Sequence, residues 1–472
     1  MTVPIQLHMR LRIIVVGGGF TGAAFILHAI RSLRGPLDFE VIEPAGEIGR
    51  GIAYGAADSR HRINVPSERM SLFPDDPLHA VRWLFDKDIL PGDGASRDAA
   101  GHHYVPRRDY GAYVADTLRQ ALSETRGRVR LRHHRTQAQD VCRQGARWSV
   151  KLADGEAITG DYVILSFGHA APRAPFPVSA EAAADPRLVT DPWRNNALAG
   201  LSRDASLLLV GTGLTMVDMV ETLLSRGHQG GITLVSRHGL LPRPHGLFGV
   251  SVDLLQGGAA PSSALALLRL VRRQVREAVR QGLGWQPVAD AVRFDLGNIW
   301  PALPVAEQRR VIKRLLPYWD VHRFRISPQA CATLERAIWT GRVVLQKAAV
   351  LSVEAESRSL VATLRRGGTV ERRPFDGVVL CIGPDKDLNR NPLARNLLAS
   401  GLARSDALHF GLDVDRHSRL VADDGHAHAT LLALGPMTRG TFGEMTGAPD
   451  IVRQIVIVTR SMADSVAMQA SA

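Results

Sequence analysis

Short apolar runs that end in glycine recur along the chain and predict the strands of parallel β-sheets. Two of these runs, at residues 13–22 and 206–216, are followed by a stretch that can form a helix. The first reads IIVVGGGFTG and the second SLLLVGTGLTM. A strand, a glycine-rich turn and a helix in this order present backbone N–H groups and a helix N-terminus to a pyrophosphate. We therefore predict an α/β fold with two Rossmann-like dinucleotide-binding domains.

The first unit carries the complete pattern of a dinucleotide-binding turn. The turn is followed by a predicted helix over residues 20–32 and a second strand over 38–42. That strand ends in an acidic residue, about 20 positions after the last glycine of the turn, where a carboxylate can accept hydrogen bonds from a ribose. The nucleotide-binding candidates of this unit are Gly17, Gly19, Gly22 and Glu43.

The second unit departs from this pattern in two ways. Its third glycine is replaced by Met216, which weakens the expectation of close packing between helix and strand. The next strand, predicted over 232–235, ends in serine and arginine in place of an acid. An arginine here can bind a 2′-phosphate, which favours NADPH, but a solvent-exposed arginine would give the same sequence, so NADH and NADPH both stay open. The candidates of this unit are Gly211, Gly213, Thr215 and Arg237.

A length of 472 residues is enough for two domains with insertions. The simplest organisation is a first nucleotide-binding domain that is split by the second. Residues 1–200 form the first part and residues 348–472 the return segment, which ends in a helix predicted over 450–468. Residues 201–347 form the second domain, with a helical insertion at about 250–335 that could shape a substrate cavity.

The formal net charge is +12, and two predicted helices, over 261–280 and 307–316, carry part of it. In the first of these helices the apolar positions share one face, and the arginines lie largely elsewhere. This arrangement is typical of a solvated helix face. Nucleic-acid binding is the less favoured alternative, because no basic motif rich in aromatic residues accompanies the charge. Excess positive charge would also attract small anionic substrates and cofactor phosphates.

No apolar run approaches the roughly 18 residues that span a bilayer, and the first apolar run leads directly into glycine. We therefore predict a soluble, cytoplasmic protein without a membrane segment. Cys142, Cys331 and Cys381 lie far apart and form no Cys-x-x-Cys motif. This spacing argues against a zinc site and against a thiol–disulfide reductase, and no metal is expected.

Six segments together resemble a family of FAD/NAD(P)-binding flavoprotein monooxygenases that is related to the flavin N-hydroxylases. The resemblance spans nearly the whole chain, and it implies that FAD binds in the first domain. NADH or NADPH would be the co-substrate in the second domain. The segments are residues 17–22, 51–55, 64–66, 105–111, 211–218 and 434–440.

The resemblance also implies roles for individual residues. The adenosine diphosphate of FAD would be held by the candidates of the first unit, and the nicotinamide nucleotide would face those of the second. Three further residues would lie near the flavin side of the cleft, although Asn64 could equally make a turn and Tyr110 could equally be part of the core. These additional cofactor-binding candidates are Asn64, Arg107 and Tyr110, together with Gly435 near the end of the chain.

By the same resemblance, the chain is an FAD-dependent monooxygenase that uses NAD(P)H and O₂ to hydroxylate a small polar or anionic substrate. Urate, converted to 5-hydroxyisourate, is the favoured substrate, because a urate hydroxylase is among the known relatives and the chain is basic. N-hydroxylation of an amino acid or amine is the alternative within this class. Outside it, the alternatives are a non-catalytic FAD-binding protein with a basic partner-binding surface and a reductase with a protein acceptor.

The sequence predicts no catalytic side chain. A flavin supplies the chemistry that other enzymes obtain from paired acids and bases, so the absence of such a motif is expected. His169, His245 and His322 are candidates for moving a substrate proton, but a single histidine is more often structural.

Overall fold

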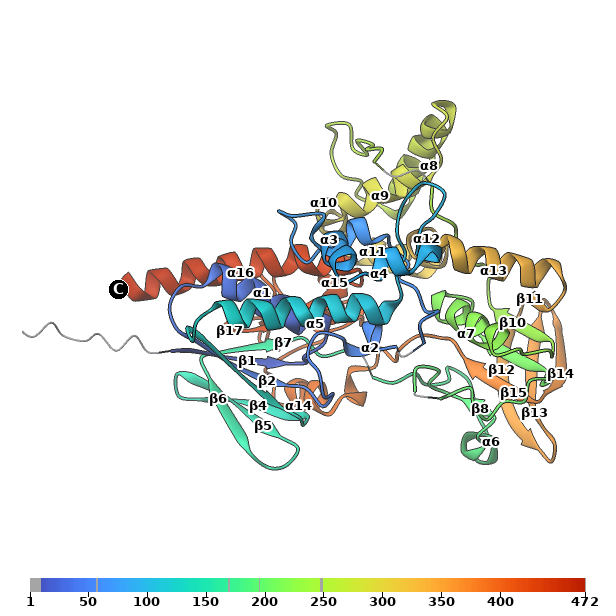
Figure 1. Cartoon of the computed structure of the whole chain (residues 1–472), viewed down its shortest axis with the longest axis horizontal. Coiled ribbons are helices and arrows are strands. Elements are labelled where there is room, and N and C mark those ends of the chain that lie inside the picture. Colours follow the sequence, from blue (N-terminus) through green and yellow to red (C-terminus); the bar gives the residue numbers. More distant parts are fainter. Residues whose placement is uncertain (1–9, 57, 169, 195, 247–248, 472) are drawn as a thin grey trace, which may run out of the picture.

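The computed structural model describes residues 10–56, 58–168, 170–194, 196–246 and 249–471. Two mainly parallel sheets lie side by side, and a group of helices lies above them in the view of Figure 1. The first sheet has the strand order β16-β17-β7-β1-β2-β3; β16 runs antiparallel to β17, and the other neighbours are parallel. Its strands are β1 (Leu11–Val16), β2 (Leu37–Ile42), β3 (Val129–His134), β7 (Tyr162–Leu165), β16 (Arg419–Val421) and β17 (Ala427–Ala433).

The alternation of side chains along β1 explains how both faces of this sheet are covered. Ile13 and Val15 belong to one apolar cluster, and Ile14 and Val16 belong to another on the opposite face. All four are at most 5% exposed, as expected for a parallel strand buried on both sides. One face packs against α1 (Phe20–Ser32), α5 (Arg107–Glu124) and α16 (Ala448–Ser471), and the other against β4 (Ala138–Gln144), β5 (Arg147–Leu152), β6 (Ala157–Gly160) and α14 (Pro392–Ala399).

The second sheet repeats this plan with the strand order β11-β10-β9-β15-β8, all parallel. Its strands are β8 (Leu188–Val189), β9 (Leu207–Val210), β10 (Ile232–Ser236), β11 (Val343–Lys347) and β15 (Gly377–Leu380). Leu207 and Leu209 point toward the helices, and Leu208 and Val210 point toward an antiparallel meander. The covering elements are α7 (Leu214–Ser225) and α13 (Pro328–Trp339) on one face, and α6 (Ala180–Ala184), β12 (Ala349–Glu356), β13 (Ser359–Arg366) and β14 (Thr369–Phe375) on the other.

Between β10 and α13 the chain forms a helical insertion, which projects from the two sheets at the top of Figure 1. Leu267, Val271 and Val275 of the first helix pack into its small apolar core, whereas Val279 is 57% exposed. The arginines of that helix at positions 269, 272, 273, 276 and 280 are all exposed. The helices are α8 (Ala264–Arg280), α9 (Gln286–Phe294), α10 (Leu296–Ala302), α11 (Val305–Arg314) and α12 (Leu316–Arg323).

The predicted α/β fold with Rossmann-like units is confirmed. The connection over residues 46–106, for which no element was predicted, contains short helices. They are α2 (Gly51–Tyr54), η1 (Ser67–Arg69), α3 (His79–Asp86), α4 (Ile89–Gly92) and η2 (Gly94–Ser96). Near the C-terminal end the chain adds η3 (Leu388–Arg390), η4 (Gly435–Thr438) and α15 (Arg439–Phe442).

The sheets do not coincide with the predicted domain boundaries after residues 200 and 347. Strand β8 precedes the first boundary and β15 follows the second, yet both belong to the second sheet. The reason is that β15 hydrogen-bonds along β9, a long-range pairing that local sequence patterns do not specify. That one nucleotide-binding domain is inserted into another stays a prediction. A second domain that contains both of these strands would begin before β8 and end after β15.

No helix within the described ranges is both long enough and apolar enough to cross a membrane. Cys142, Cys331 and Cys381 are all free thiols. Among the residues that the structure covers, no three His, Cys, Asp or Glu side chains are grouped so that they could hold a metal ion.

Gly22 provides a direct test of how α1 is seated on the sheet. A Cβ atom at this position would lie 2.1 Å from the carbonyl oxygen of Gly17, so Gly22→Ala forces helix and turn apart. We expect a loss of about 1–3 kcal/mol and a fall of several degrees in the Tm of the FAD-free protein. Gly213→Ala is the matched control, because a Cβ there would meet nothing within 4 Å. Equal Tm values for the two variants would contradict this packing.

Candidate functional site

The first glycine-rich turn and the first turn of α7 border a cleft of about 1670 Å³ between the two sheets, whereas Gly211 and Gly213 of the second turn are not among its lining residues. The first unit contributes Gly17, Gly19 and Glu43 to its lining, and the second unit contributes Thr215. The carboxyl ends of β7 and β15 also reach the cleft, through the loops that follow them. The site thus lies where ligands bind in open α/β folds, outside the carboxyl ends of the parallel strands.

The first turn leaves no room for side chains. Gly17 has φ +98°, and a Cβ atom on it would lie 2.6 Å from the carbonyl oxygen of Ser166 at the end of β7. Gly19 caps α1, and no side chain occupies the helix N-terminus. The first N–H groups of α1 therefore remain available to an anion in the cleft. This arrangement fits a pyrophosphate.

Glu43 supports the turn from the end of β2. Its carboxylate accepts hydrogen bonds of 2.9 Å from the backbone N–H groups of Gly18 and Ala45. Each carboxylate oxygen can accept more than one hydrogen bond, so both retain capacity for a further donor. Because Glu43 also lines the cleft, its position fits the predicted contact with a ribose hydroxyl.

The second turn has the same construction. Gly211 has φ +101°, and a Cβ atom there would lie 2.3 Å from the carbonyl oxygen of Cys381, just beyond β15. Gly213 caps α7 without a side-chain hydrogen bond. Met216, at the place of the missing glycine, is fully buried in the core, so α7 packs closely without it. One face of α7 lines the cleft, and its residues are Thr215, Met219, Thr222 and Arg226.

Other predicted residues lie outside the cleft lining. Arg237 follows β10 and is exposed. Gly435 is buried with φ +77°, and a Cβ atom on it would lie 2.8 Å from Oγ1 of Thr21, so this glycine allows the chain after β17 to approach α1. Its neighbour Pro436 does line the cleft. Cofactor contacts by Arg237 and Gly435 stay predictions.

Neither Asn64 nor Tyr110, both expected near the flavin side of the cleft, is among the residues that line it, and a flavin contact by Asn64 stays a prediction. Tyr110 is fully buried, and its hydroxyl donates a 2.7 Å hydrogen bond to the carbonyl oxygen of Met70. Burial raises the pKa of Tyr110 well above its ordinary value. The backbone oxygen of Asn64 lies 2.8 Å from Nε2 of His245. Tyr110 is thus a core residue, the structural alternative considered for it.

The histidines named from the sequence do not converge on the cleft either. His169 lies outside the described residues. His322 is 2.7 Å from the carbonyl oxygen of Tyr318 in its own helix, and neither His322 nor His245 lines the cleft. The histidine that does line it is His61, which sequence reasoning missed because it stands in the connection that showed no pattern.

A set of five side chains, which we call the interdomain polar cluster, joins the two nucleotide-binding units beside the cleft. Nη2 of Arg107, at the start of α5, lies 2.9 Å from Oδ2 of the buried Asp218 on α7. Nε2 of His61 lies 2.8 Å from Oγ1 of Thr222, which donates a 3.1 Å hydrogen bond to Asp58. The cluster thus couples α7 to the first domain.

Burial shifts the pKa values of two side chains in this cluster. It raises the pKa of Asp218, although the Arg107 guanidinium acts in the opposite direction. Burial also lowers the pKa of His61, despite the nearby carboxylates of Asp218 and Asp58. The guanidinium of Arg107 lies 5.5 Å from the ring centre of Trp193, which also lines the cleft. Arg107 is therefore at the cleft, as predicted, but its charge is directed at Asp218.

Comparisons with known proteins agree with this architecture. A family model described as FAD-NAD(P)-binding matches residues 14–170, which contain the first glycine-rich unit. No curated protein sequence matches the chain. Among solved structures, the ornithine N-hydroxylase of Kutzneria sp. 744 has a TM-score of 0.64 at 14% identity, over 97% of this chain and 100% of that chain.

Two further structures have the same fold over nearly their whole length. The L-lysine 6-monooxygenase of Pseudomonas syringae has a TM-score of 0.61 at 17% identity, covering 97% of this chain and 99% of that chain. The cadaverine monooxygenase of Erwinia amylovora has a TM-score of 0.61 at 12% identity, covering 96% and 94%. At such identities the similarity establishes a common fold for the entire chain.

The ion pair between Arg107 and Asp218 can be tested by removing its partners in turn. Arg107→Met leaves a buried carboxylate without its cation, and we expect a loss of about 3–5 kcal/mol, seen as a lower Tm at pH 8. Adding Asp218→Asn to the same chain removes the stranded charge and restores part of the Tm. A double variant no more stable than Arg107→Met alone would contradict the pairing.

His245 predicts a pH dependence of stability. Burial lowers its pKa from 6.5 to about 4, so the folded protein binds this proton less readily than the unfolded chain. The contribution is fully present above about pH 6.5 and is lost as the pH falls toward 4. His245→Gln should therefore reduce the fall in Tm between pH 7 and pH 4, by the equivalent of about 1–3 kcal/mol. The exposed His238→Gln is the control, and identical pH profiles for both variants would refute the assignment.

Proposed function

We propose that this chain is an FAD-dependent monooxygenase that uses NAD(P)H and O₂ to hydroxylate the nitrogen of a small primary amine. The observation that carries the proposal is one cleft lined by the glycine-rich turn of the first nucleotide-binding unit and by Thr215, in the first turn of the helix that follows the glycine-rich turn of the second unit. Two dinucleotides in one cleft allow a hydride to pass between them. A structural dinucleotide would need only one such turn.

The residues of the first unit fit FAD. The N–H groups at the start of α1 would bind its pyrophosphate, and Glu43 would accept a hydrogen bond from its ribose. Bound FAD would accept a hydride from NAD(P)H and supply the reducing equivalents that activate O₂. The protein's part is to hold the substrate nitrogen in place and to keep water out of the cleft.

The second unit would hold the nicotinamide nucleotide at the N-terminus of α7, next to Thr215. The chain leaves NADH and NADPH equally open, because Arg237 is exposed and lies outside the cleft lining. In the overall reaction, NAD(P)H supplies two electrons as a hydride, and one further proton is taken up. One atom of O₂ then forms the N–O bond in place of an N–H bond, and the other leaves as water.

An amine is preferred to urate as the substrate, which reverses the order favoured from the sequence. The structures that share the fold over nearly the whole chain are named for oxidising ornithine, lysine and cadaverine, and each of these molecules carries a primary amine. Urate was supported by family resemblance and by the net charge of +12. That charge lies partly on the exposed arginines of α8, outside the cleft lining, so it favours an anionic substrate less than the sequence suggested.

The non-catalytic alternative, an FAD-binding protein with a basic partner surface, does not explain why the chain has a second glycine-rich turn. It requires that α7 have no nucleotide to bind, although its N-terminus lacks a side-chain cap and Thr215 lines the cleft. A reductase that passes electrons to a protein acceptor would use both turns. It differs from the proposal in forming no hydroxylated product.

A substrate panel tests the proposal. FAD-loaded protein is mixed with NADPH or NADH and with ornithine, lysine, cadaverine or urate, while nicotinamide oxidation, O₂ uptake and product are followed together. We expect one amine to give a hydroxylamine in amounts that match the NAD(P)H consumed. Stoichiometric 5-hydroxyisourate from urate would replace the amine proposal. Flavin reduction without hydroxylated product from any of the four would contradict hydroxylation of these substrates.

The nicotinamide side of the cleft can be blocked separately. Thr215→Trp places a large ring at the first turn of α7, where Thr215 lines the cleft. We expect the protein to keep its bound flavin while anaerobic flavin reduction slows by about tenfold or more, the effect of about 1.4 kcal/mol on the barrier. Ser225→Trp, at the exposed end of the same helix, is the control and should be reduced at the ordinary rate. Unchanged reduction of Thr215→Trp would argue against nucleotide binding at α7.

A further inference from the structure

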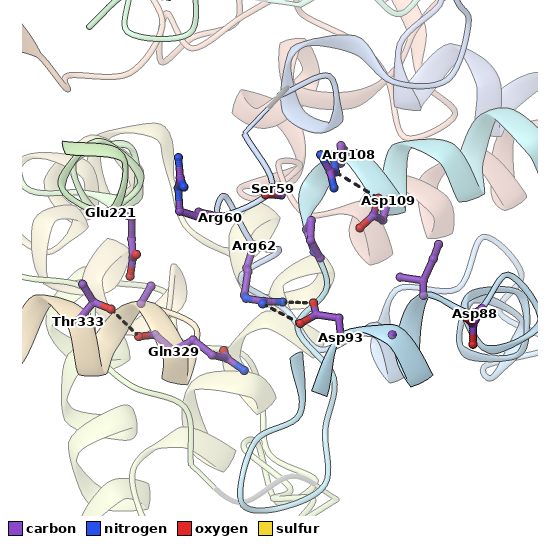
Figure 2. A pocket seen from close by; sticks show the side chains of 14 residues that line it. Ser59, Arg60, Arg62, Asp88, Asp93, Arg108, Asp109, Glu221, Gln329 and Thr333 are labelled. Atoms are coloured by element: carbon purple, nitrogen blue, oxygen red, sulfur yellow. Dashed lines mark hydrogen bonds and ion pairs between the residues drawn. The ribbon is translucent and has the colours of Figure 1, made fainter. Parts of the chain in front are cut away.

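A second pocket, of about 610 Å³, is lined by chain neighbours of the interdomain polar cluster. Figure 2 shows the side chains that line this pocket. The two cavities share a wall, because neighbouring residues of the same segments face opposite sides. His61 lines the cleft, whereas Arg60 and Arg62 line the pocket. On α7, Thr222 faces the cleft and Glu221 faces the pocket. The pocket is of the size that holds a small organic molecule.

The guanidinium groups of this pocket already have carboxylate partners. Arg62 donates to both carboxylate oxygens of Asp93, at 2.7 and 3.2 Å. Nε of Arg60 lies 3.1 Å from Asp58, on the cleft side of the wall. The third pair is Arg108 with Asp109, at 3.5 Å. An anionic ligand would have to compete with these carboxylates.

Among the described residues, the half-buried Glu221 and the exposed Asp88 are the acidic side chains of this pocket that form no ion pair. The carboxylate of Glu221 interacts with the hydroxyl of Thr333 on α13, and the charges of Arg62 and Arg60 also act on it. In Figure 2 the Glu221 side chain extends into the space between Arg60 and Thr333. Partial burial raises the pKa of Glu221, although the hydroxyl of Thr333 and the guanidinium groups of Arg62 and Arg60 act in the opposite direction.

Gln329 lines the same pocket with an amide whose oxygen is buried. Its Nε2 donates hydrogen bonds to the carbonyl oxygens of Ala95 and Ser96, at 3.0 and 2.9 Å. These bonds fix the orientation of the amide, and Oε1 has no partner among the described residues.

We propose that this pocket binds the cationic group, a primary ammonium or a guanidinium, of a small organic molecule, with Glu221 as its counter-ion. A charge-assisted hydrogen bond from such a group to Glu221 would supply the missing positive charge, and the hydroxyl of Thr333 lies beside it. The inference concerns a site separate from the cleft, and it holds whether or not the enzyme hydroxylates amines.

The position of the pocket gives binding a structural consequence. Its lining includes Arg60, Arg62 and Asp93 of the first nucleotide-binding unit, and residues of α7 and α13 from the second. A molecule held there contacts both units, through chain neighbours of the cluster that contains the pair formed by Arg107 and Asp218. Occupation of the pocket therefore favours the interdomain arrangement in which that pair is formed.

Calorimetric titration of the FAD-loaded protein with cadaverine tests the proposal. NADP⁺ is added at saturation so that the nicotinamide part of the cleft is filled. The neutral diol and the dicarboxylate of the same chain length are titrated in parallel. We expect saturable binding of cadaverine alone, weakened about tenfold or more by Glu221→Gln. Asp88→Asn removes the same charge at an exposed position of the same pocket and should change the Kd by no more than about twofold.

A second variant keeps the proposal testable if Glu221→Gln fails to fold. Ala330→Lys introduces an ammonium group from the pocket wall on α13, and it should abolish cadaverine binding while the protein retains FAD. The absence of saturable cadaverine binding to the wild-type protein, equal affinity of Glu221→Gln, or preferential binding of the dicarboxylate would each overturn the proposal. None of these outcomes is measured through enzymatic turnover. The proposed binding site can therefore be refuted while the proposed function holds, and the reverse.

Discussion

The whole arrangement depends on two glycine turns that fit against the backbone of a neighbouring strand end. Gly17 and Gly211 have nearly the same positive φ, +98° and +101°. Each lies so close to a carbonyl oxygen, that of Ser166 or Cys381, that no Cβ atom could be accommodated. Because these contacts draw the start of each helix to the carboxyl edge of its sheet, both helices present free N–H groups to the cleft. A larger residue at either position would displace the helix and close its anion site.

The interdomain polar cluster determines how the two turns face each other. Its ion pair and hydrogen bonds join α7 to the start of α5 and to the segment around His61. Chain neighbours of the same cluster residues line the second pocket, so the two cavities share a wall. Arg107 therefore matters for the site through geometry, since its guanidinium is paired with Asp218 within the protein.

The parts of this structure that the sequence predicted are those that depend on neighbouring residues. Helix α1 begins and ends where expected, β2 and β10 lie within one residue of their predicted ranges, and each glycine-rich turn joins a strand to a helix as predicted. The parts that it did not predict depend on contacts between distant segments. Tyr110 could be recognised as a core residue only once Met70 was known to lie beside it. Asp218 gave a partial signal, as an acidic residue on the apolar α7, but its partner Arg107 is 111 positions earlier (218 − 107).

The central claim is that two dinucleotides occupy one cleft close enough to exchange a hydride. Anaerobic rapid mixing of the FAD-loaded protein with NADPH, and separately with NADH, measures this directly through the flavin absorbance. The account predicts that the oxidised flavin spectrum bleaches with at least one of the two nucleotides, at a rate that saturates with nucleotide concentration. A protein that binds FAD but is not bleached by either nucleotide would contradict the account.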